Sequence, residues 1–184
     1  QRETIRFSSM IVTARDFTTM AVSKTIGPLH FEDLEPHRFE DLARQLIYYL
    51  RNWREIEATG RGGADDGFDV RAYEIVAGND VEPRLDDDGS EGDNPDPVIA
   101  RLWAIQCKRE KSIGPKKLRE YVAAIPNRDG GDAVYGLIIV AACDFSKAAR
   151  DAFREACHER GFEQFQLIAK AEIEDMLFQP RFDH

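Results

Sequence analysis

The fold of this chain is decided by the stretch Leu102-Trp103-Ala104-Ile105-Gln106-Cys107-Lys108-Arg109. Its residues have the β-branched, aromatic and apolar character of a strand. Side chains alternate between the two faces of a strand, so one face of this stretch is apolar and carries Trp103, Ile105 and Cys107. Gln106 and Lys108 share the other face, where their spacing of two residues puts an acceptor and a donor side by side.

A second β-like run covers residues 68–76 and begins just before Asp69. If the two runs pair as an antiparallel hairpin, Asp69 can lie next to Gln106 and Lys108, although no residue fixes the register. A carboxylate, a carboxamide and an ammonium that converge on one point suit a hard divalent metal and the water it activates. Asp66 is the rival carboxylate as a contributor to the metal site, although Asp-Asp-Gly is also a usual turn sequence.

Length and composition predict one domain with appendages, namely a domain at residues 31–180 and an N-terminal extension or linker of unknown role at residues 1–30. No apolar run approaches the roughly 20 residues that span a bilayer, and we expect no membrane partner. There is no secretory signal, and three cysteines cannot all pair. A reduced, cytoplasmic setting is expected. The chain begins with Gln1 rather than Met, which favours a piece of a longer protein.

Charge is distributed unevenly along the chain, whose net charge is −9. Residues 79–97 hold eight acidic residues and one Arg, and are predicted to form an acidic hairpin insertion. Residues 101–119 hold seven basic residues and one Glu. Because local fields govern phosphate binding more than the total charge does, the acidic balance is compatible with a nucleic-acid partner.

The remaining patterns predict an α/β sandwich with a mixed sheet. Apolar periodicity and turn signals indicate three helices at residues 35–53, 115–125 and 171–177, a buried strand at 134–142 and a final strand at 165–168. A further helix is expected to begin at Asp144 or Ser146 as its cap and to end at Gly161.

These features resemble the Mrr-type restriction endonuclease domain of the PD-(D/E)xK nuclease superfamily. Five pieces match in the family's order, between about residues 34 and 177: Phe39-Glu40-Asp41-Leu42, Gly67-Phe68-Asp69-Val70, Ile105-Gln106-Cys107-Lys108-Arg109, Tyr135-Gly136-Leu137-Ile138-Ile139-Val140 and Asp144-Phe145-Ser146-Lys147-Ala148-Ala149. The resemblance implies a restriction-endonuclease-like α/β/α sandwich with a mixed central β-sheet. The acidic insertion and the first thirty residues depart from the family pattern.

The resemblance also implies roles for individual residues. Asp69 would be the principal metal ligand, with Gln106 in the place that many relatives give to Glu, and with the backbone carbonyl of Cys107. Glu40 from the first helix would complete the shell, unless it is simply solvated. Lys108 would orient or help to deprotonate the attacking water. Such oxygen ligands favour Mg²⁺, with Mn²⁺ able to substitute.

The function expected from this resemblance is a metal-dependent DNA endonuclease, the effector or restriction module of an antiviral defence protein. Its substrate would be double-stranded DNA, and one active site per domain predicts a homo-oligomer or further domains of a longer chain. The basic residues after the strand are candidates for DNA contacts: Arg109, Lys111, Lys116, Lys117 and Arg119. Two alternatives stay open, a catalytically idle nuclease fold that binds DNA or mediates assembly, and a nuclease for RNA or branched DNA.

Overall fold

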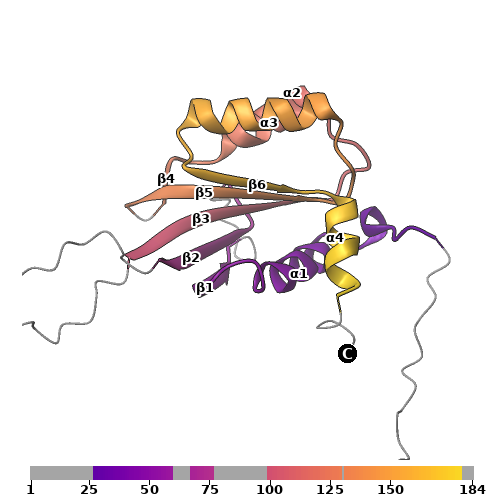
Figure 1. Cartoon of the computed structure of the whole chain (residues 1–184), viewed down its shortest axis with the longest axis horizontal. Coiled ribbons are helices and arrows are strands. Elements are labelled where there is room, and N and C mark those ends of the chain that lie inside the picture. The colour runs from indigo at the N-terminus through magenta and orange to yellow at the C-terminus, as the bar shows by residue number, and fades with distance from the viewer. Residues whose placement is uncertain (1–26, 60–66, 77–98, 130, 180–184) are drawn as a thin grey trace, which may run out of the picture.

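The computed structural model describes residues 27–59, 67–76, 99–129 and 131–179. They form a six-stranded mixed sheet with helices on both faces (Figure 1), which confirms the expected α/β/α sandwich. The acidic insertion, Asp66 and most of the expected N-terminal extension lie outside these residues. Over the described part of the chain, every helix is too short or too polar to cross a membrane.

The elements follow one another as η1 (Phe31–Asp33), α1 (Pro36–Ile47), β1 (Trp53–Ala58), β2 (Val70–Val76), β3 (Ile99–Lys108), α2 (Pro115–Ala124), β4 (Arg128–Asp129), β5 (Asp132–Ala141), α3 (Lys147–Arg160), β6 (Gln164–Ile168) and α4 (Lys170–Leu177). The sheet has the order β1-β2-β3-β5, with β6 paired to β5 and the short β4 paired to the start of β5. β2 is antiparallel to both of its neighbours, whereas β3, β5 and β6 are parallel to one another.

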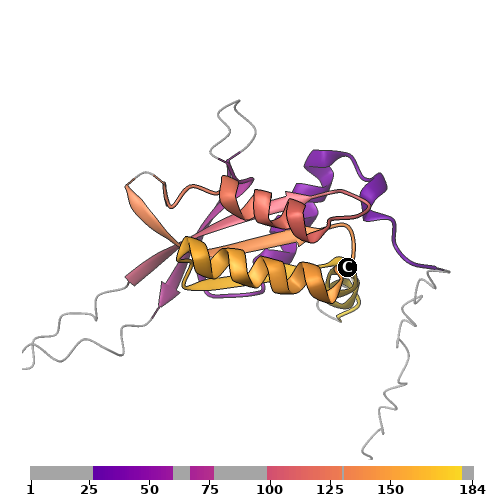
Figure 2. The ribbon, with the colours of Figure 1, turned by 90° about the horizontal axis from the view of Figure 1, so that it is seen from above.

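The two parallel crossovers place both of their helices on one face of the sheet. α2 connects β3 to β5 and α3 connects β5 to β6, and the two helices lie side by side over the sheet (Figure 2). α1 and α4 cover the opposite face (Figure 1). The carboxyl ends of β3, β5 and β6 therefore meet at one edge, the usual place for a ligand site in a sheet of this kind.

Alternation along β3 divides the hydrophobic core into two layers, as the sequence predicts. Leu102 and Ala104 pack in the layer under α2 and α3. Trp103 and Ile105 pack in the layer under α1 and α4, with Cys107 at its margin. Gln106 is the buried polar residue among those described. An apolar strand that ends in polar residues thus passes from the core into the candidate site.

The predicted helix at residues 35–53 is confirmed over residues 36–47 and is wrong in its last six residues. α1 ends at Ile47, and the following residues turn into β1, a strand that we did not expect. The indole Nε1 of Trp53 donates a hydrogen bond of 2.7 Å to the carbonyl oxygen of Ile47, which also accepts the N–H of Leu50 at 2.9 Å, so the last carbonyl of the helix is satisfied by the turn and by the strand that follow it. The same ring meets Trp103 edge to face at 6.0 Å. Trp53 therefore belongs to the sheet layer and helps to end the helix.

The helix predicted to begin at Asp144 or Ser146 and to end at Gly161 is confirmed at both of its ends. The Oγ of Ser146 accepts a hydrogen bond of 3.2 Å from the N–H of Ala149, so Ser146 is the cap of α3. Gly161 ends the helix in the left-handed region at a φ of 78°. Asp144, the other candidate cap, instead accepts the N–H of Ala171 at 3.1 Å and so joins the end of β5 to α4.

Candidate functional site

The register of β2 and β3 brings Asp69 to Gln106. Val70 lies opposite Ile105, and the N–H of Asp69 donates to the carbonyl oxygen of Ile105 at 3.0 Å. The Oδ2 of Asp69 accepts the N–H of Cys107 at 2.6 Å. An ionised carboxylate has about four lone-pair sites, so this hydrogen bond fixes the group against β3 and leaves it capable of binding a cation.

Gln106 buries its amide at the same point and is only 7% exposed. Its Nε2 donates to the carbonyl oxygen of Gly67 at 3.2 Å. Its Oε1, on the other prong of the amide, is buried and has no hydrogen-bond partner among the residues that the structure describes. An unpaired buried acceptor costs about 1–3 kcal/mol, and a bound cation would remove this cost.

Gly67 holds the carbonyl that orients the Gln106 amide. Its φ is 84°, in the left-handed region that glycine tolerates. A Cβ at this position would lie 3.0 Å from the carbonyl oxygen of Ala124 and 3.2 Å from the Cδ of Pro126, just beyond the end of α2. A close approach between two chain segments therefore sets the direction of the Gly67 carbonyl, and this site depends on glycine.

Gly67→Ala is expected to weaken the binding of a divalent metal to the site by about tenfold, because a shifted Gly67 carbonyl no longer fixes Gln106. Titration calorimetry with Mn²⁺ measures the affinity, and thermal unfolding measures the stability. Gly161→Ala is the matched control, since Gly161 has a similar φ of 78° with open space around a Cβ. It should lose about 1–2 kcal/mol of stability and keep its metal affinity. Equal affinities in the two variants would contradict the role of Gly67.

Lys108 follows on the same face of β3 and points toward α2. Its Nζ lies 4.6 Å from the centroid of the Tyr121 ring. In the described ranges it forms no ion pair, although Lys117, Glu110 and Tyr121 are joined to one another nearby. An ammonium on an aromatic face keeps its charge and its remaining donors available to a further ligand.

Cys107 separates Gln106 from Lys108 and points to the α1 side of the sheet. Burial raises the pKa of its thiol well above the ordinary value, the charges of Asp69 and Glu40 raise it further, and the charge of Lys108 lowers it. The thiol is therefore neutral and is not suited to nucleophilic attack. Both carboxylates and the ammonium are therefore within electrostatic reach of this thiol.

Glu40 reaches the region from α1, on the other side of the sheet from Lys108. Its Oε2 pairs with the Nδ1 of His37 at 3.1 Å, and its side chain is 28% exposed. The carboxylate is thus near Cys107 but engaged with a neighbouring imidazole. Its role in a metal shell stays a prediction, as does the role of the Cys107 carbonyl.

The five basic residues proposed for DNA contacts differ in their surroundings. Arg109 donates to the carbonyl oxygens of Glu32 and Leu34, and so ties the end of β3 to the segment before α1. The other four are exposed: three pair with carboxylates, namely Lys116 with Glu120, Lys117 with Glu110 and Arg119 with Glu155, while Lys111 has no ion-pair partner in the described part of the chain. The ion pair between Lys116 and Glu120 is long, at 3.9 Å. Lys111 and Lys116 are therefore the cations most available to a phosphate.

The donor set is poor in carboxylates. No three His, Cys, Asp or Glu side chains among the described residues come together as a metal cluster. The candidate oxygen donors on the two strands are those of Asp69 and Gln106, and Glu40 lies within electrostatic reach of Cys107. A set made only of oxygen donors suits Mg²⁺ or Mn²⁺ rather than zinc, and the unpaired buried Oε1 of Gln106 fits such an ion.

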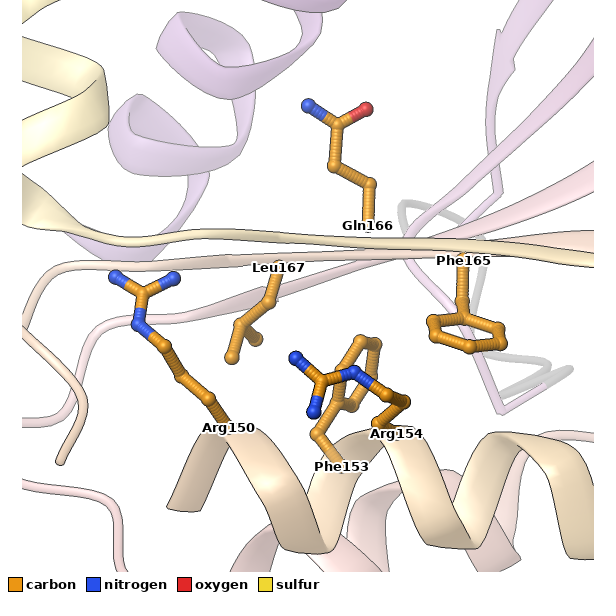
Figure 3. Close-up of a pocket in the computed structure, with 6 residues that line it drawn as sticks. All are labelled: Arg150, Phe153, Arg154, Phe165, Gln166 and Leu167. Atoms are coloured by element: carbon orange, nitrogen blue, oxygen red, sulfur yellow. The ribbon is translucent and has the colours of Figure 1, made fainter. Parts of the chain in front are cut away.

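A cavity elsewhere in the described part of the chain lies away from these residues. It has a volume of about 260 Å³ and opens between α3 and β6, with Phe153, Phe165 and Leu167 directed into it and Gln166 directed to the opposite face of the sheet (Figure 3). Arg150 and Arg154 rise from α3 at its rim and pair with Glu172 and Asp151. It shares no residue with the candidate site.

The sequence does not predict that three further residues belong to the site. Tyr121 and Glu110 are brought to Lys108 only by the packing of α2, and their spacing in the chain gives no signal of it. Gly67 carries a signal in hindsight, since a glycine directly before a strand often marks a close approach of the backbone.

Comparison with families of known proteins places most of the chain in one of them. The model of the family described as restriction endonuclease, the Mrr catalytic domain, matches residues 31–177, which is most of the chain. Comparison with curated proteins and with solved structures returned no match.

Proposed function

The chain belongs to the Mrr-type restriction endonuclease family, which makes it a nuclease of this type, and on that premise we propose that it is a divalent-metal-dependent DNA endonuclease. The reaction is hydrolysis of a phosphodiester. A water oxygen bonds to phosphorus, the bond from phosphorus to the leaving sugar oxygen breaks, and that oxygen takes up a proton.

One observation carries the proposal: the buried Oε1 of Gln106 has no partner in the described residues, and the N–H of the next residue, Cys107, donates to the Asp69 carboxylate. Asp69, Gln106 and the Cys107 carbonyl would hold Mg²⁺ or Mn²⁺, with Glu40 as a further ligand. When bound, the ion supplies Lewis acidity at the phosphate and lowers the pKa of water. Because Gln106 is neutral, the site carries one charge fewer than a pair of carboxylates would, so the phosphate of the substrate would contribute to binding of the ion.

Lys108 has a distinct role in the proposal. Its ammonium is on the same face of β3 as Gln106 and has no ion-pair partner in the described chain, so it can hold the attacking water and face the phosphate. In the transition state, negative charge grows on the phosphate oxygens, and a positioned cation stabilises it. Lys111 and Lys116 would contact neighbouring phosphates and set the register of the DNA.

We further propose that the domain acts as the effector of an antiviral restriction system on double-stranded DNA. A single site cuts one strand at a time, so cleavage of both strands would require a homo-oligomer or sequential nicking. Further domains of a longer chain could supply recognition.

Cleavage of supercoiled plasmid tests the proposal. The protein is expected to nick it with Mg²⁺ or Mn²⁺ and to stop with EDTA, while Lys108→Met, which keeps an unbranched side chain but removes the charge, lowers the rate by about 10²–10³-fold. Single-stranded RNA and branched DNA are tested in parallel, and faster cleavage of either would replace duplex DNA as the substrate. If the protein binds DNA but does not cleave it at any metal concentration, the enzyme assignment is wrong and the chain is an idle nuclease fold.

A further inference from the structure

Lys108 belongs to a cluster of four side chains that spans β3 and α2. Its Nζ lies over the ring of Tyr121 at 4.6 Å from the centroid, and the Nζ of Lys117 lies 5.7 Å from the same centroid. The hydroxyl of Tyr121 and the ammonium of Lys117 both donate to Glu110, one to each carboxylate oxygen. Two ammonium groups, one ring and one carboxylate thus share a small volume beside the candidate site.

Glu110 is the carboxylate with which either Lys108 or Lys117 could form an ion pair. Burial raises the pKa of its carboxyl, but hydrogen bonds from Lys117 and Tyr121 and the charge of Lys117 outweigh this effect, and the net pKa lies below the ordinary value. The charge of Lys108 lowers it as well, so Lys108 is within electrostatic reach of the carboxylate. Glu110 nevertheless pairs with Lys117 and not with Lys108.

Tyr121 contacts both groups, since its ring lies under the Lys108 ammonium and its hydroxyl donates to Glu110. Burial and the hydrogen bond to Glu110 raise the pKa of the Tyr121 hydroxyl, so it remains a donor at neutral pH. A donor hydroxyl fixes the ring, and the fixed ring presents its negative face to Lys108. A cation on such a face is held without an anionic partner, so its charge stays available to a phosphate.

We propose that Tyr121 and Lys117 are positioning residues for Lys108: the Tyr121 ring holds the ammonium, and Lys117 occupies Glu110 so that Glu110 does not capture it. The inference deepens the proposed nuclease function and rests on it for the role of Lys108 in cleavage. The arrangement itself is a property of the folded chain and can be tested without substrate.

The position of Lys108 over the ring is tested by nuclear magnetic resonance of the whole chain after reductive methylation of its lysines with ¹³C-formaldehyde. Lys108→Arg assigns the Lys108 signal. That signal is expected upfield of the other lysine signals, since it lies over an aromatic ring. It should stay upfield in Tyr121→Phe and move to the position of exposed lysines in Tyr121→Leu. A Lys108 signal that Tyr121→Leu leaves in place would overturn the inference, whatever the protein does to DNA.

Kinetics test the consequence. Tyr121→Leu is expected to lower kcat for plasmid nicking by about tenfold, with KM and the affinity for Mn²⁺ unchanged, whereas Tyr121→Phe keeps most of the rate. Tyr48→Leu is the matched control, because Tyr48 is 53% exposed and lies beyond the end of α1. A rise in KM or a loss of metal affinity together with the fall in kcat, or the same loss of rate in the Phe variant, would mean that Tyr121 has only a structural role.

Lys117 separates positioning from phosphate binding. Lys117→Ala frees Glu110 to pair with Lys108 and should lower kcat by about tenfold, and a second change, Glu110→Gln, should restore it. Lys116→Ala removes the same charge from the same helix and should raise KM instead. If Lys117→Ala also acts only on KM, Lys117 is a DNA contact and the inference fails. If the wild type does not cleave at all, the proposed function fails, while the resonance of Lys108 still decides the inference.

Discussion

Asp69→Asn is expected to lower the rate of metal-dependent cleavage by roughly a thousandfold. Asn keeps the size of the side chain. Its amide oxygen can still accept the hydrogen bond that the N–H of Cys107 donates to Oδ2 of Asp69 at 2.6 Å in the wild type. What it removes is the negative charge. Since Gln106 is already neutral, the strands β2 and β3 would then offer the ion no anionic ligand, and Glu40 alone would remain.

Calorimetry and cleavage together test this expectation. Mn²⁺ should bind Asp69→Asn at least about tenfold more weakly than wild type, while thermal unfolding stays close to wild type. Asp132→Asn is the matched control, because Asp132 is an exposed residue that accepts the Tyr73 hydroxyl at 3.3 Å, far from β3's carboxyl end. Wild-type affinity and cleavage in Asp69→Asn would exclude Asp69 as the metal ligand, and Asp66 would then be examined in the same way.

Much of the fold could be predicted because β3 obeys simple alternation. The apolar face with Trp103 and Ile105 and the polar pair of Gln106 and Lys108 follow from the period of two, and the structure has them so. β5 could be recognised from its unbroken apolar run, which is typical of a strand buried on both faces. These features depend on residues that are close together in the chain.

The features that could not be predicted depend on contacts between distant segments. Residues 48–53 are predicted to continue α1, and only the contacts of Trp53 with Ile47 and Trp103 show that this segment leads into a strand. In the site, Tyr121 reaches Lys108 only through the packing of α2 on the sheet, and Gly67 owes its constraint to the carbonyl of Ala124 at the end of that helix. No local pattern encodes such approaches, because they are set by how the helices pack.

Gly136→Ala is expected to have the largest effect on stability, lowering the free energy of unfolding by about 3 kcal/mol. A Cβ at Gly136 would lie 2.5 Å from the Cε3 of Trp103 on the adjacent strand. The ring cannot move aside easily, because it is fully buried and its Nε1 donates to Glu74 at 2.8 Å. Arg51 covers the ring at 4.0 Å. The methyl group would therefore force β3 and β5 apart.

Chemical denaturation of Gly136→Ala, Trp103→Leu and the double variant tests whether the clash is the cause. Trp103→Leu alone should cost about 3 kcal/mol and should make room for the new methyl, so the double variant should lose clearly less than the two single losses combined. Gly114→Ala is the control for adding a methyl group, since a Cβ there would meet nothing within 4 Å. If the losses in the free energy of unfolding are additive, the effect of Gly136→Ala comes from the backbone at position 136 and not from the contact with Trp103. Because Trp103 lies on the same strand as Gln106 and Lys108, coupling between positions 103 and 136 would also mean that the absence of a side chain at Gly136 allows β5 to pack closely against the strand that carries the site residues.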